Sequence, residues 1–101
     1  MRLSNIKSIV LDAHENNSYQ HVNIYINNDL VHNSAIFYGY DDFYEQYSLN
    51  WLKNNIFSDY ANKNIVNNCS FFWQLRDVLE ITILGFKNYI NKKELDKKAI
   101  K

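Results

Sequence analysis

The chain has 101 residues, of which 47% are hydrophobic and 16% aromatic, so we expect a single packed domain over residues 1–101 and exclude a disordered protein. No apolar run reaches the roughly 18 residues of a membrane helix and no signal peptide is visible, which predicts a cytoplasmic protein that does not bind membranes. Eleven basic and eleven acidic residues balance, and the lone Cys69 excludes an internal disulfide and a cysteine metal cluster.

The first third of the chain predicts an antiparallel β-meander over residues 6–38. Residues 6–12 are rich in β-branched side chains and lead into a polar cluster at 14–18, which indicates a strand followed by a loop. Residues 20–27 alternate between apolar and polar side chains, and this period of two is typical of a half-buried strand.

A hairpin is expected to join this second strand to a third. Asn28 and Asp29 tolerate positive φ, which suits a tight turn. Residues 30–38 then return as the partner strand, and Gly39 ends it.

A helix is predicted next, over residues 42–55, because Asp42 and Glu45 have the spacing of a capping box. Its apolar side chains separate into two stripes. Leu49, Leu52 and Ile56 form an aliphatic stripe, which we expect to dock on the sheet. The aromatic stripe, on nearly the opposite side, consists of Phe43, Tyr44, Tyr47 and Trp51.

The second half of the chain predicts further helices. Residues 54–68 are rich in asparagine and are expected to form a loop with a short turn. Apolar residues at helical spacing favour a helix over 70–86, although β-branched residues leave a buried strand over 78–84 as an alternative. The lysine-rich residues 87–98 predict a polar terminal helix. The predicted fold class is therefore α+β, with a meander packed against two or three helices.

The chain carries no recognisable catalytic motif, so we expect neither an enzyme nor a cofactor or small-molecule substrate. Only two glycines are present, and neither begins a phosphate loop or a nucleophile motif. The three histidines match no common metal-ligand spacing and are expected on the solvent face or in loops. The neighbouring Asp41 and Asp42 are interpreted as a helix cap and dipole partner rather than a metal site.

The charges are distributed unevenly along the chain. Residues 11–52 contain six carboxylates and no lysine or arginine, whereas residues 53–101 contain nine basic and five acidic residues. The acidic half also holds nine aromatic side chains. Because most protein surfaces mix both signs of charge, this half predicts a surface that meets a basic partner.

Segment 38–47 is the candidate contact site. Tyrosine contributes a large contact area and a hydroxyl at low entropic cost, and nearby carboxylates attract lysine and arginine over a distance. The alternative, that these rings fill the core, is left open. The candidate partner-binding residues are Tyr38, Tyr40, Asp41, Asp42, Tyr44, Glu45 and Tyr47.

In its size, its composition and segment 38–47, the chain resembles the immunity proteins that neutralise bacterial toxins, in particular those of contact-dependent growth inhibition systems. The resemblance implies a specific complex with a cognate toxin domain, often a basic nuclease. The carboxylates would then mimic phosphate toward the basic groove of the toxin, and the tyrosines would act as buried anchors.

Two other classes of function stay open. A phage or mobile-element inhibitor, such as an anti-CRISPR protein, would use the same negative surface to mimic nucleic acid. A small nucleic-acid-binding regulator would instead use the six lysines of the last 15 residues. Lysines without arginine or interleaved aromatic residues are more typical of a solvated helix face, so we expect no binding to nucleic acid.

Overall fold

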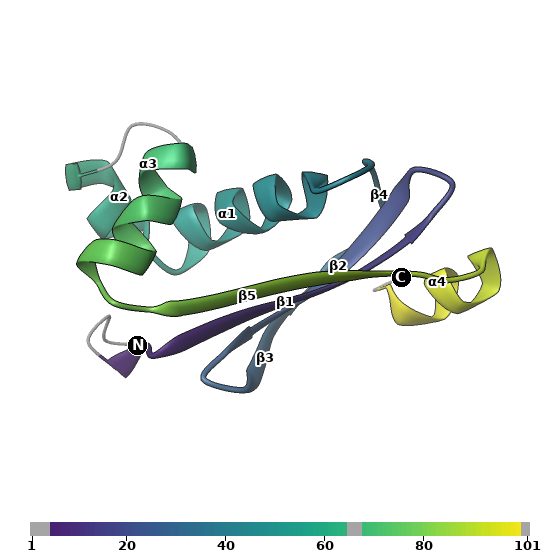
Figure 1. Cartoon of the computed structure of the whole chain (residues 1–101), viewed down its shortest axis with the longest axis horizontal. Helices are drawn as coiled ribbons and strands as arrows, with labels where there is room; N and C mark the ends of the chain where they lie inside the picture. The colour runs from purple at the N-terminus through teal and green to yellow at the C-terminus, as the bar shows by residue number, and fades with distance from the viewer. Residues whose placement is uncertain (1–4, 65–67, 100–101) are drawn as a thin grey trace.

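In a computed structural model, the chain forms an α+β fold in which helices cover a five-stranded sheet (Figure 1). The structure describes residues 5–64 and 68–99. The strands are β1 (Ser8–Asn16), β2 (Tyr19–Ile26), β3 (Asp29–Asn33), β4 (Phe37–Tyr38) and β5 (Thr82–Tyr89). The helices are α1 (Phe43–Asn55), α2 (Ser58–Asn64), α3 (Asn68–Trp73), a π-helical turn (Gln74–Val78) and α4 (Lys92–Lys98).

The sheet is mixed and is centred on β1. Its strand order is β3-β2-β1-β5, and the short β4 also pairs with β2. β1 runs antiparallel to β2 and parallel to β5. Both tight turns, at Asn17-Ser18 and at Asn27-Asn28, have positive φ at their two central residues, as the twist of a two-residue hairpin requires.

Alternation along β1 and β2 directs one row of apolar side chains toward the helices. Helix α1 packs against β1 and β2 on this inner face, and α2 and α3 pack against α1 on the same side of the sheet (Figure 1). Leu49 and Leu52 of α1 are buried there, as the aliphatic stripe predicted, and Ile56 packs against them. The row from the two strands consists of Ile9, Leu11, Ala13, Val22, Ile24 and Ile26.

Helix α4 packs against β1 and β2 at the far end of the sheet, on its outer face. Asn91 caps the helix by accepting from the Glu94 N–H at 2.8 Å, and its Nδ2 donates to the Glu94 carboxylate. Leu95 and Ala99 are buried beneath it, and Asn33 Nδ2 donates to the Lys98 carbonyl at 3.1 Å. The part of the chain that the structure describes contains no helix with the length and apolar character needed to cross a membrane.

The predicted meander is confirmed, with shifted boundaries. β1 continues to Asn16, so the loop expected at 14–18 shrinks to a two-residue turn. The next turn lies one residue earlier than predicted, and the third strand divides into β3 and β4. In the segment expected as a loop, Ser58–Asn64 is helical.

The helix predicted over 70–86 is wrong beyond its first part. Helical structure ends at Val78, and residues 82–89 form β5, which pairs in register with residues 8–15. The alternative strand over 78–84 captures only the first three residues of β5. The terminal helix predicted over 87–98 begins at Lys92, because residues 87–89 complete β5.

The capping box predicted at the start of α1 is also wrong. Asp42 occupies the N-cap position, but its side chain makes no cap hydrogen bond. The aromatic stripe is not wholly outward either, because Tyr44 is only 3% exposed.

Candidate functional site

The chain leaves the sheet at β4 and enters α1 through residues 39–42, and aromatic side chains gather on the surface around this junction. Tyr38 is 66% exposed, Tyr40 is 58% exposed, and Tyr19 and Phe43 are about half exposed. The rings of Tyr19 and Tyr38 meet edge to face with centroids 5.7 Å apart, and Tyr38 and Tyr40 do so at 6.5 Å. We define the acidic tyrosine surface as Tyr19, Tyr38, Tyr40, Asp41, Asp42 and Phe43.

An open hollow of about 510 Å³ lies within this surface, lined by residues 38–43 and Gln46. Aromatic rings left in contact with water retain apolar area that a partner can bury, and clustered exposed aromatics are typical of the energetic centres of interfaces. Each phenol also keeps a hydroxyl that can form a directed hydrogen bond. The arrangement suits binding of a protein surface.

The carboxylates of Asp41 and Asp42 are both exposed beside these rings. Among the described residues, no lysine, arginine or histidine side chain forms an ion pair with either one. Two adjacent unneutralised carboxylates generate a local negative potential that accelerates encounter with a basic surface. They also occupy the start of α1, where negative charge is favoured by the helix dipole.

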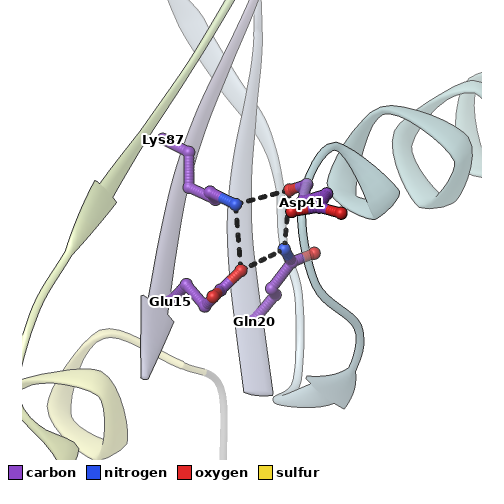
Figure 2. A network of polar contacts seen from close by, with 4 residues as sticks. All are labelled: Glu15, Gln20, Asp41 and Lys87. Atoms are coloured by element: carbon purple, nitrogen blue, oxygen red, sulfur yellow. Dashed lines mark hydrogen bonds and ion pairs between the residues drawn. The ribbon is translucent and has the colours of Figure 1, made fainter. Parts of the chain in front are cut away.

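A largely buried polar network fixes the loop that carries this surface (Figure 2). The carbonyl oxygen of Asp41 accepts from Lys87 Nζ at 2.6 Å and from Gln20 Nε2 at 3.1 Å. The same two donors bind Glu15 Oε1, at 3.0 Å and 2.7 Å respectively. Side chains from β2 and β5 therefore converge on one backbone carbonyl of the loop, and Glu15 of β1 holds both donors in place.

The Glu15–Lys87 pair is well shielded, with each side chain about 10% exposed. Burial by itself lowers the pKa of Lys87, but contacts of its ammonium with Glu15 and Tyr89 outweigh that effect and hold the pKa above its usual value. Lys87 thus supplies, from the second half of the chain, the positive charge that residues 11–52 lack.

The backbone of the junction has two special positions. A Cβ atom at the buried Gly39 would lie 2.5 Å from Phe43 Cδ2 and 3.1 Å from Gln20 Oε1, so only glycine fits there without displacing the Phe43 side chain or the start of α1. Asp41 adopts φ of 52°, a left-handed conformation that aspartate and asparagine tolerate better than most residues.

Four of the seven predicted contact residues, Tyr38, Tyr40, Asp41 and Asp42, are exposed together. Tyr44 is instead a core residue that packs over Gly85, and its pKa is raised by burial and by the neighbouring carboxylates.

The remaining two, Glu45 and Tyr47, are half-buried. Burial, and then the nearby Asp42 charge, raise the pKa of Glu45. Tyr47 stacks on Phe37 with centroids 4.4 Å apart, and its hydroxyl lies 2.9 Å from His32 Nε2. These residues support the surface more than they form it.

Two exposed residues of the surface, Tyr19 and Phe43, were not among those predicted. Phe43 lay inside the candidate segment but was assigned to the aromatic stripe of the helix. Tyr19 is distant in sequence and reaches Tyr38 because β4 pairs with the start of β2. Recognising it requires the strand register, which the local pattern does not provide.

The acidic half of the sequence does not form a single negative face. Glu15 is neutralised by Lys87, Asp12 lies 3.4 Å from His14, and Asp29 begins β3 at a different turn. Only three of the six carboxylates stay close together. They belong to Asp41, Asp42 and the half-buried Glu45, one turn along α1.

The prediction of exposed histidines is wrong for His14 and His21, which are buried on the outer face beneath α4. Their Nδ1 atoms lie 3.2 Å apart. Asn33 donates to the Lys98 carbonyl, so its Oδ1 faces His21 Nε2 at 3.0 Å, and this nitrogen must carry a proton. In the neutral pair, His21 Nδ1 is then the acceptor and His14 Nδ1–H the donor.

Within the described chain, no group of three histidine, cysteine, aspartate or glutamate side chains is arranged to hold a metal ion. From the sequence, a lone cysteine such as Cys69 is predicted to be a small buried hydrophobe, and its side chain lies outside the described residues.

Comparison of the chain with protein-family models, with curated proteins and with solved structures finds no match. The functional argument therefore depends on the geometry of the surface itself.

Proposed function

We propose that the chain is an immunity protein that acts in the cytoplasm, where it binds and neutralises a toxin domain with a basic surface, such as a nuclease. The observation that carries the proposal is the grouping of exposed Tyr19, Tyr38, Tyr40 and Phe43 with the unneutralised Asp41 and Asp42. In this proposal the chain neither acts as an enzyme nor requires a cofactor.

In this mechanism the two components of the surface have separate roles. The carboxylates attract the basic groove of the toxin and raise the association rate. The tyrosines become desolvated anchors that slow dissociation. Because the Glu15–Lys87 network already fixes the loop, little conformational entropy is lost on binding, which favours an affinity of about nanomolar or tighter.

Affinity capture with the tagged chain tests the proposal. The parent chain is expected to retain a basic protein from the producing cells that is toxic when expressed alone. Tyr38→Ala/Tyr40→Ala removes two exposed anchors and is expected to abolish capture, with a loss of about 2 kcal/mol for each anchor. Toxicity should then return in cells that co-express the toxin with this variant.

The matched control is Leu30→Ala/Val78→Ala, which removes two exposed apolar side chains outside the acidic tyrosine surface. It should capture the toxin as the parent does. Equal capture by the Tyr38→Ala/Tyr40→Ala variant, or a captured protein that is harmless when expressed alone, would argue against the proposal.

The inhibitor of phage or mobile-element origin would use the same surface, and the capture experiment separates it by the identity of the partner. A nucleic-acid-guided or nucleic-acid-cleaving defence complex would favour the mimic, and a toxin encoded beside this chain would favour the immunity protein. Binding of nucleic acid through the exposed lysines of α4 would instead appear as a retained complex in a gel shift at moderate salt.

A further inference from the structure

β5 forms one edge of the sheet, and its outward backbone groups have no partner strand in the described chain. The Thr82 N–H donates to the Lys7 carbonyl and the Ile90 N–H donates to the Glu15 carbonyl, both at 3.0 Å. Even-numbered residues of β5 therefore turn their N–H and C=O groups toward β1. The odd-numbered residues Ile83, Gly85 and Lys87 turn theirs toward the open edge.

This edge lacks most of the features that usually prevent strand pairing between molecules. Proteins commonly protect an edge with a bulge, a proline, a short strand or an outward charge. β5 instead pairs with β1 over eight consecutive residues without a register shift, and the chain contains no proline. Its one charged side chain, Lys87, points inward, and an inward charge can itself protect an edge. Here the charge is neutralised by Glu15, and the Asp41 carbonyl holds the ammonium on the inner face of its own molecule.

The middle of the outer face of the same strand is apolar and uncovered by the described helices. Leu84 is 59% exposed and Phe86 is 47% exposed, and both lie on the face opposite to Ile83 and Gly85. Helix α4 covers this face only at the end that contains His14 and His21. An open backbone edge thus coincides with an exposed apolar row.

We propose that two copies of the chain pair through β5 to form a symmetric dimer with one continuous sheet. A twofold axis through Gly85 places Ile83 opposite Lys87 of the second copy, so all outward N–H and C=O groups between residues 83 and 87 find partners. Leu84 then lies opposite Phe86 of the second copy on the outer face, at a position where cross-strand side chains approach closely. Because of the symmetry, this apolar pair occurs twice.

The charges that flank β5 favour the same antiparallel arrangement. Glu80 precedes the strand, whereas Lys92 and Lys93 follow it, and all three are exposed. Antiparallel pairing brings the acidic start of one strand toward the basic end of the other. A parallel arrangement would place like charges together at both ends.

The dimer goes beyond the proposed function and does not depend on it, because neither Leu84 nor Phe86 belongs to the acidic tyrosine surface. Charge-exchange variants test the register. Leu84→Lys/Phe86→Lys and Leu84→Glu/Phe86→Glu change only exposed side chains, so the fold is expected to persist, with far-ultraviolet circular dichroism as the check.

Light scattering coupled to size-exclusion chromatography is expected to give a dimer for the parent chain at about 100 µM. Each charged variant alone should be a monomer, and their equimolar mixture should form a one-to-one heterodimer through lysine–glutamate pairs. A monomeric parent at that concentration would overturn the dimer. Charged variants that stay dimeric alone, or whose mixture fails to associate, would overturn the β5 interface.

Discussion

Lys87 leaves β5 toward the inner face of the sheet, and its ammonium donates to Glu15 Oε1 and to the Asp41 carbonyl. The lysine lies 46 residues from Asp41 in sequence, and only the parallel pairing of β5 with β1 brings them together. Nothing in the local pattern around Lys87 separates it from the other lysines of the second half. Its structural role was therefore invisible to sequence reasoning.

Lys87→Met is expected to destabilise the fold by about 3 kcal/mol, because it leaves the shielded Glu15 carboxylate without its counter-charge. The free energy of unfolding from urea denaturation measures the effect. The double variant Glu15→Gln/Lys87→Met restores neutrality and should recover most of the loss. A single variant as stable as the parent would mean that the pair contributes nothing to the fold.

The buried histidines predict how stability depends on pH. Burial lowers the pKa of both His14 and His21 below 6.5. Attraction to Asp12 opposes this decrease, whereas repulsion from Lys98 adds to it. For His14, repulsion from the neighbouring His21 lowers the pKa further. Burial and His21 also lower the pKa of His32. The unfolded chain thus binds these protons more tightly than the folded chain does, so protonation favours unfolding.

This contribution to stability is fully present above pH 6.5 and is expected to be lost progressively as the pH falls below that value. Urea midpoints at about pH 7.5 and about pH 5.5 should show the decrease. Glu45 acts with the opposite sign, because its raised pKa stabilises the protonated form. NMR titration of the imidazoles resolves the two effects, and a His21 pKa above 6.5 would contradict the prediction.

At the scale of elements, the meander was predictable because its pattern is local. Alternation in β2 buries Val22, Ile24 and Ile26 on one face, as the sequence indicated. The extension of β1 to Asn16 was missed because His14 and Glu15 look like loop residues. They lie in a strand because β2 and β5 pair with them on both sides.

β5 was missed for a similar reason. The apolar residues from Phe72 to Phe86 fit helical spacing, and local propensity leaves helix and strand nearly balanced. The strand forms because β1, which lies 74 positions earlier in the chain, has a free edge. Eight residues of β1 pair in parallel with β5 along that edge. A side-chain N-cap does occur, at Asn91 of α4 rather than at the predicted Asp42, and the Asn91 side chain also donates to the Glu94 carboxylate.

Because the junction between β4 and α1 is tightly packed, a single added methyl group is expected to destabilise the fold. Gly39→Ala places a Cβ atom 2.5 Å from Phe43 Cδ2, so the Phe43 ring or the start of α1 must shift, at a cost of about 1–3 kcal/mol. Urea denaturation measures the loss. Gly85→Ala is the matched control, because its nearest contact is the Tyr44 hydroxyl at 3.1 Å and requires a smaller adjustment. Equal stability of both variants would contradict the steric argument.

At the scale of the whole molecule, the uneven charge of the sequence predicted the acidic tyrosine surface only in part. Folding disperses or neutralises Asp12, Glu15 and Asp29, and it buries Tyr44. The side chains of Tyr38, Tyr40 and Phe43 stay exposed where the chain passes from β4 to α1. The sequence pattern of residues 38–47 indicated this part of the surface. The contribution of Tyr19 follows only from the pairing of β4 with β2.

The most direct test of the central proposal is the association rate of the captured partner with the Asp41→Asn/Asp42→Asn variant, measured by stopped flow over a range of salt concentrations. Asparagine preserves the shape of both side chains and tolerates the positive φ at Asp41, so only charge is removed. The control Asp29→Asn/Asp59→Asn makes the same change in net charge at exposed positions elsewhere.

The surface variant is expected to associate more slowly than the parent at low salt and to show a weaker dependence on ionic strength, because screening then has less attraction to remove. The control should behave much as the parent does. Association of the surface variant at the parental rate and with the parental salt dependence would contradict a role for this surface in binding.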